Sequence, residues 1–172
     1  MLLHCEGSVI SLTLGDEIAH WFQGYKKLAI MGIGNPLRRD DGVGVEIINQ
    51  LTDKVPECVR LFNCEMVPEI FLSDIEAYQP THLLIIDAAE LKTKPGEAKI
   101  IPPQKIGSTT FSSHTIPLSL LASIIDEAVK TKIMFLGIQP FSTGFGEDLS
   151  PELQMATKKI VKTISEALKK IK

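Results

Sequence analysis

The sequence has few cysteines and no long hydrophobic run, and both absences narrow the class of protein. Its 172 residues include only three cysteines and no C-x-x-C pair, so neither a disulfide framework nor a structural zinc site is expected. Apolar runs such as 83–86 and 133–138 are far shorter than the roughly 20 residues of a membrane helix. With no export signal at its start, the chain is predicted to be cytoplasmic, with no membrane contact.

An excess of positive charge is also missing, and so are the common catalytic motifs. The formal net charge is -3 at pH 7, which gives no electrostatic reason to expect nucleic acid as a partner. The sequence contains no H-E-x-x-H helix, nucleophile elbow, Asp-Thr-Gly pair or P-loop. At this length, with 44% hydrophobic residues, a single domain over 1–172 is predicted.

Strand-like and helix-like patterns alternate along the chain. An amphipathic helix is expected around His20, Trp21 and Phe22, where it would pack on the body of the protein. The apolar patterns predict strands over 28–33, 59–62, 82–88, 98–102 and 133–138. Between and after them they predict helices over 42–51, 68–78 and 117–130, and a last helix that begins at Pro151 and is capped by Ser150. This alternation is typical of the α/β class, with a mostly parallel sheet between two layers of helices.

The most informative stretch is Gly-Ile-Gly-Asn-Pro-Leu-Arg-Arg-Asp-Asp-Gly-Val-Gly at 32–44. It resembles the dinucleotide fingerprint G-x-G-x-x-G but has Leu37 in place of the third glycine. Two aspartates at the start of a helix would also repel a pyrophosphate bound there. We therefore expect no organic cofactor. Of the two carboxylates, Asp40 is interpreted as a helix-start residue that supports Asp41.

Three residues are candidates for a site: Asp41, Asp87 and His114. Asp41 follows the first strand, Asp87 ends the run Leu-Leu-Ile-Ile, and His114 follows the long loop 102–113. In an open parallel sheet, residues past the carboxyl ends of the strands line the ligand crevice where the strand order reverses. If the second and third strands flank the first, Asp41 and Asp87 face each other and His114 can complete the set. Such a set suits nickel, zinc or iron, with open coordination positions.

Four blocks of this sequence resemble the [NiFe]-hydrogenase maturation endopeptidases. Besides 32–44, they are Leu-Leu-Ile-Ile-Asp-Ala at 83–88, Ser-Ser-His-Thr-Ile-Pro-Leu at 112–118 and Phe-Leu-Gly-Ile-Gln-Pro at 135–140. The last two look most like the subtype that serves formate-hydrogenlyase and membrane-bound hydrogenases. The resemblance covers about residues 28–170, the protease core, and leaves 1–27 as an N-terminal extension. It implies a twisted five-stranded sheet between helices.

The resemblance also implies a reaction and a partner. Such an enzyme trims the C-terminal extension of the hydrogenase large-subunit precursor after nickel insertion, with Asp41, Asp87 and His114 contacting the metal. The nickel would arrive in the substrate, where it can polarise the scissile carbonyl or activate water, and either carboxylate can act as general base. A monomer that meets the precursor transiently is sufficient for a single cut.

Two alternatives and one departure from the family pattern stay open at this point. The alternatives are a non-catalytic module that checks nickel loading or binds the immature large subunit, and a hydrolase of small amides or peptides with its own zinc. The departure is Asn63-Cys64-Glu65, where relatives commonly carry Asp-Gly after the second strand. Either Asn63 acts by hydrogen bonding, Glu65 substitutes for the aspartate, or the position is structural.

Overall fold

The computed structural model describes residues 12–101 and 116–170, which contain a five-stranded sheet with the order β2-β1-β3-β5-β4. Neighbouring strands run parallel except β4, which is antiparallel to β5. The strands are β1 (Leu28–Ile33), β2 (Val59–Glu65), β3 (His82–Ala88), β4 (Ala98–Ile101) and β5 (Lys132–Ile138). The predicted α/β class and mostly parallel sheet are confirmed.

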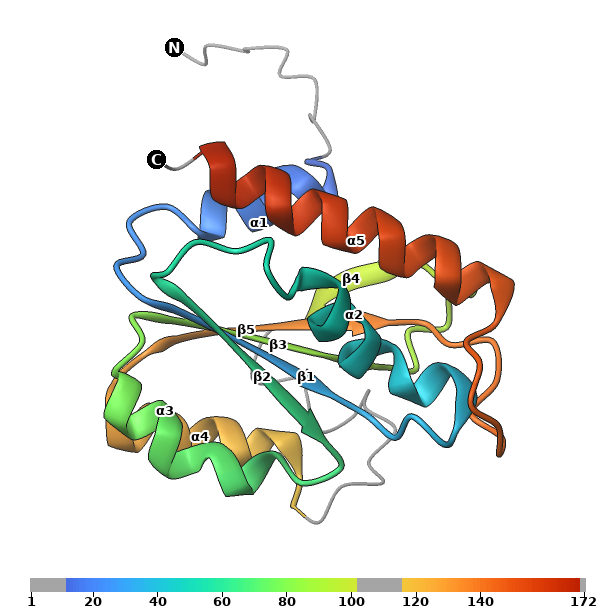
Figure 1. Ribbon diagram of the computed structural model, residues 1–172, viewed down its shortest axis with the longest axis horizontal. Helices are drawn as coiled ribbons and strands as arrows, with labels where there is room; N and C mark the ends of the chain where they lie inside the picture. The colour runs from blue at the N-terminus through green and yellow to red at the C-terminus, as the bar shows by residue number, and fades with distance from the viewer. Residues whose placement is uncertain (1–11, 102–115, 171–172) are drawn as a thin grey trace, which may run out of the picture.

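Helices cover both faces of this sheet and make it the middle of three layers (Figure 1). On one face lie α1 (Leu14–Trp21), α2 (Val43–Leu51) and α5 (Pro151–Lys170), and on the other lie α3 (Leu72–Tyr78) and α4 (Leu118–Val129). Two short 3-10 helices, η1 (Arg39–Gly42) and η2 (Pro68–Phe71), precede α2 and α3. None of the helices in the described residues is long and apolar enough to cross a membrane.

The central strands β1 and β3 are buried along their whole length. Alternate residues point to opposite faces of a strand, so Leu28 and Ile30 join the core beneath α1, α2 and α5, whereas Ala29 and Met31 join the core beneath α3 and α4. A strand covered on both faces is apolar at nearly every position. That is why these strands were visible in the sequence as continuous apolar runs.

The described part of the predicted N-terminal extension contains α1, which is integral to the core. Thr13 and Asp16 form a capping box at its start, and α1 packs against α5. Ile18 and Phe22 are fully buried in the same cluster as the α5 side chains. The amphipathic helix predicted around His20 is therefore confirmed.

The structure corrects several predicted boundaries. β2 runs three residues further than predicted, through Asn63, Cys64 and Glu65, and it ends in a bulge in which Gly32 pairs with Asn63 and Ile33 with Glu65. The first turn of the helix predicted over 68–78 is the 3-10 helix η2, and α4 begins one residue after Pro117. The predicted strand end at 102, and residues 171–172, lie outside the described residues.

Candidate active site

The strand order reverses between β1 and β3, as the sequence interpretation required. From β1 the chain passes through α2 to β2 on one side, and the next strand, β3, lies on the other side of β1. In such a sheet, loops leave the crevice open at the carboxyl ends of the two strands. η1, with Asp41, follows β1, and Asp87 is the last residue but one of β3.

Asp41 is held in a closed turn between β1 and α2. Its side chain is only 2% exposed, and the backbone N–H of Asn35 donates to its Oδ2 at 3.2 Å. The side chain of Asn35 in turn accepts from the N–H of Leu37 at 2.9 Å. Gly34, with a φ of 137°, lies against the Asp41 carbonyl, where a Cβ would collide. The turn therefore depends on residues of the 32–44 motif.

Asp87 is fully buried at the end of β3. Its Oδ1 accepts a hydrogen bond from the N–H of Ala88 at 2.8 Å. By the alternation of the strand it shares a face with Leu83 and Ile85, which belong to the core beneath α3 and α4. A carboxylate thus follows four apolar residues of the strand, Leu83 to Ile86, which favours a functional over a structural role.

The first turn of α2 brings the ends of β1 and β3 together. A Cβ at Gly44 would collide with the carbonyl oxygens of both Ile33 and Ile86, and η1 packs against β3. Only glycine allows this close approach, which places Asp41 and Asp87 at the same edge of the sheet. The third predicted residue, His114, lies outside the described residues.

Asp40 has a larger role than the helix-start role that the sequence indicated. It is fully buried, and its Oδ2 accepts from the N–H groups of Phe141 and Ser142 at 2.9 and 3.0 Å. Ser150 donates to it twice, from its N–H to Oδ1 at 2.7 Å and from its hydroxyl to Oδ2 at 2.9 Å. Asp40 therefore fixes η1 to the loop between β5 and α5. Its partners are more than 100 residues away in sequence, so no local pattern indicated them.

The residues that depart from the family pattern support this turn, Glu65 through its backbone and Asn63 through its side chain. The carbonyl of Glu65 accepts from the N–H of Gly34 at 2.9 Å, and the amide of Asn63 donates to Asn49 Oδ1 of α2 at 3.4 Å. Cys64 is buried, and burial raises the pKa of its thiol. These contacts favour the structural reading of the position.

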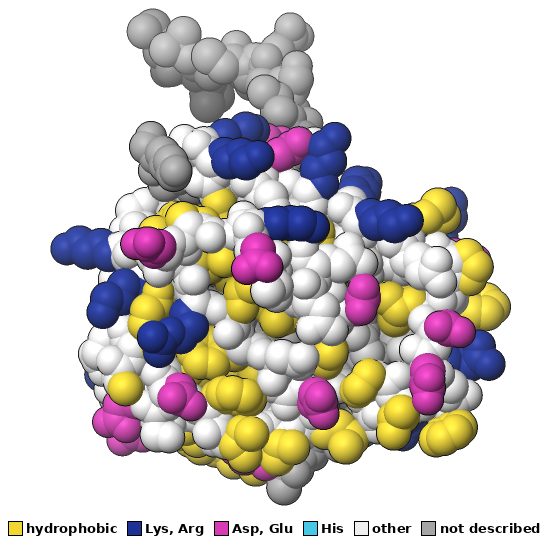
Figure 2. All heavy atoms as spheres, in the orientation of Figure 1, with side chains coloured by type: hydrophobic (Ala, Val, Ile, Leu, Met, Phe, Trp, Pro, Cys, Tyr) yellow, Lys and Arg dark blue, Asp and Glu magenta, His cyan; other side chains and the backbone are white. Residues whose placement is uncertain are grey.

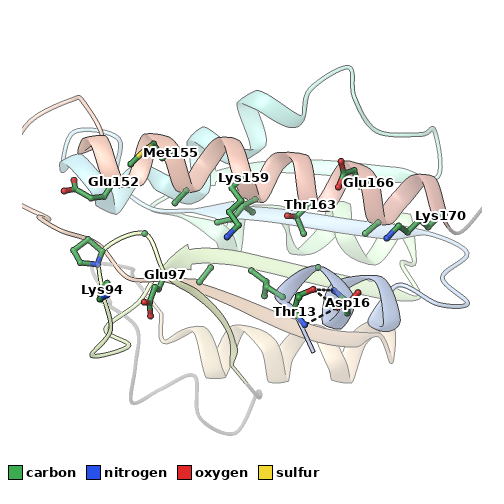
Figure 3. A pocket seen from close by; sticks show the side chains of 18 residues that line it. Thr13, Asp16, Lys94, Glu97, Glu152, Met155, Lys159, Thr163, Glu166 and Lys170 are labelled. Atoms are coloured by element: carbon green, nitrogen blue, oxygen red, sulfur yellow. Dashed lines mark hydrogen bonds between the residues drawn. The ribbon is translucent and has the colours of Figure 1, made fainter. Parts of the chain in front are cut away.

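A cavity of about 870 Å³ lies away from these carboxylates, between α1, α5 and the segment leading into β4 (Figure 3). Side chains of both charge signs line it, and neither Asp41 nor Asp87 is among them. The labelled residues in the view include Asp16, Lys94, Glu97, Glu152, Lys159 and Lys170. We therefore place the candidate active site at the strand ends and not in this cavity.

Comparison with known proteins decides the family. The model of the HycI hydrogenase maturation protease family matches residues 45–167. The chain belongs to this family. It is 36% identical over 155 residues to a protein of Methanocaldococcus jannaschii named as a hydrogenase maturation protease, covering 86% of this chain and 91% of that protein. It is also 31% identical over 117 residues to the hydrogenase 3 maturation protease of Escherichia coli K12, covering 67% and 74%.

Solved structures of hydrogenase maturation proteases share the fold. The crystal structure of HycI from Thermococcus kodakarensis superposes with a TM-score of 0.82 at 32% identity, over 89% of this chain and 99% of that one. The solution structure of the endopeptidase HycI from Escherichia coli gives a TM-score of 0.74 at 26% identity, over 81% and 90%. The chain is thus a hydrogenase maturation endopeptidase, and membership in a family of proteases favours the predicted enzyme over both alternatives.

Proposed function

We propose that this endopeptidase removes the C-terminal extension of a [NiFe]-hydrogenase large-subunit precursor after nickel has been inserted. The observation that carries the proposal is the pair of buried carboxylates, Asp41 and Asp87, at the carboxyl ends of adjacent parallel strands. The four sequence blocks that resemble the maturation endopeptidases include both residues.

The two carboxylates suit a metal that the substrate brings. Both lie at one edge of the sheet, and carboxylate oxygens are ligands for divalent transition metals. Nickel held by the precursor would meet these oxygens only after it has been inserted. The same ion would polarise the scissile carbonyl, and one carboxylate would accept a proton from the attacking water.

We assign the third ligand to His114. Among residues 12–101 and 116–170, no three His, Cys, Asp or Glu side chains gather as a metal site. His114 belongs to the block 112–118, one of the four that resemble the maturation endopeptidases. His114 is two residues before Ile116, which packs against the cluster that contains Ile85.

Substitutions at the three residues test the proposal. Asp41→Asn, Asp87→Asn and His114→Ala are each expected to slow processing of nickel-loaded precursor by at least about 100-fold, since each removes a metal ligand or a proton acceptor. The mass of the precursor measures the cut, and the thermal midpoint checks the fold. Asp74→Asn makes the same chemical change on the exposed surface of α3 and should process normally. Full activity of any site variant would remove that residue from the site.

A further inference from the structure

Three large apolar side chains stand exposed beside η1. Leu37 is 50% exposed, Phe141 66% and Phe145 86%. Burying such a side chain stabilises a fold by about 1.5 to 3 kcal/mol, so leaving three of them in water on neighbouring segments gains the fold nothing. In Figure 2, hydrophobic side chains gather at the right-hand edge, where Figure 1 places the loop between β5 and α5.

The backbone beneath these side chains is fixed by pairing between two distant segments. The N–H of Arg39 donates to the Gly146 carbonyl at 2.7 Å, and the N–H of Gly146 donates to the Leu37 carbonyl at 2.9 Å. The guanidinium Nε of Arg38 donates to the Thr143 carbonyl at 3.1 Å. The loop between β5 and α5 is thus tied to the turn that carries Asp41.

The carboxylate of Asp40 also holds this loop, at its start and at its end. Its buried carboxylate accepts from Phe141 and Ser142 at one end of the loop and from Ser150 at the other. Aromatic side chains on a preorganised backbone lose little conformational entropy when a partner covers them. Exposed, rigidly held phenylalanines are therefore typical of a binding surface.

We propose that Leu37, Phe141 and Phe145 form a docking surface for an apolar segment of the large-subunit precursor, beside the bond that is cut. The inference rests on the proposed function. An endopeptidase acts on a polypeptide, and Leu37 lies in the turn that carries Asp41, four residues earlier.

Two arginines beside the docking surface indicate the charge of the precursor segment that binds there. Arg38 and Arg39, which follow Leu37 in the chain, are exposed. The Nε of Arg39 donates to the Phe145 carbonyl at 3.4 Å, as that of Arg38 does to Thr143, and each guanidinium has further N–H groups. The precursor segment that fits this surface is apolar. It carries a carboxylate at its edge that accepts hydrogen bonds from the two guanidinium groups.

Truncation of the phenylalanines tests the docking surface. For Phe145→Ala and Phe141→Ala, we expect the Kd for the precursor, and the KM for its cleavage, to rise about tenfold, as for a residue at the centre of an interface. The rise in KM should exceed any fall in kcat, and the thermal midpoint should stay unchanged because both side chains are largely exposed. Leu12→Ala, which truncates a 60% exposed side chain before α1, is the matched control and should change neither constant.

The outcomes separate this inference from the proposed function. If the wild-type protein cleaves the precursor and both phenylalanine variants keep its KM and Kd, the docking surface is wrong and the proposed function stands. If the wild-type protein binds without cleaving and Phe145→Ala weakens binding, the docking surface stands and the proposed function falls. A wild-type protein that does not bind the precursor, or a self-association that Phe145→Ala abolishes without changing precursor binding, overturns the docking surface.

Discussion

Gly34 lies so close to the carbonyl oxygen of Asp41 that no side chain fits at its position. Its φ of 137° is also one that other residues rarely adopt. The contact closes the turn after β1 and sets the backbone of the residue that we place in the active site. Gly34 therefore sets the backbone position of Asp41, seven residues later.

Gly34→Ala is expected to lower the free energy of unfolding by about 3 kcal/mol or more, because strain at positive φ adds to the collision with Asp41. Urea unfolding, followed by the fluorescence of the single tryptophan, measures the loss. Gly24→Ala is the matched control, since Gly24 has a φ of 76° but a Cβ there would meet nothing within 4 Å. It should lose only about 1 to 2 kcal/mol. Equal losses would contradict the close approach.

Asp40→Ala should destabilise the protein by about 3 kcal/mol, because three partly buried backbone N–H groups lose a charged acceptor. Ser150→Ala removes only one hydroxyl donor, which also caps α5 through the N–H of Leu153, and should cost about 1 kcal/mol. In a double-mutant cycle by urea unfolding, the double variant should lose less free energy of unfolding than the sum of the two single losses. Fully additive losses would show that Asp40 and Ser150 do not interact.

Stability should fall at mildly acidic pH because of His82. Burial, with a smaller effect from the charge of Lys132, lowers the pKa of His82, and its ring packs edge-on against Trp21 at 5.0 Å. The unfolded chain therefore binds a proton more readily than the folded one. The stabilisation is present above the unfolded pKa of about 6.5 and is lost as the pH falls below it.

Urea unfolding between about pH 7.5 and pH 5.5 measures this loss. His82→Phe keeps an aromatic ring against Trp21 and should flatten the decline. His20→Gln, at an exposed position of α1, should leave the decline unchanged. A decline of the same size in the His82 variant would refute the assignment.

Cys64 should resist alkylation in the folded protein. It is buried, and burial raises the pKa of its thiol, so little reactive thiolate forms. Cys58 is only half-buried and should react with iodoacetamide before Cys64 does, as mass spectrometry of the peptides would show. After unfolding, both should react. Equal labelling rates in the folded protein would contradict the buried position of Cys64.

The sequence predicted the core strands and the edge of the sheet at which Asp41 and Asp87 lie. Strands buried on both faces are continuous apolar runs, and the rule for parallel sheets then places the residues that follow them. The end of β2 was missed because polar Asn63 and Glu65 alternate with buried Cys64. The anchoring role of Asp40 was also missed, since it depends on a loop about 100 residues away. The place of His114 in the site stays a prediction.

The mass of a large-subunit precursor, prepared with and without nickel and incubated with this protein, tests nickel-dependent cleavage most directly. We predict loss of the C-terminal extension from the nickel-loaded precursor only. Cleavage of the nickel-free precursor at the same rate, or a loaded precursor that stays intact, would contradict it.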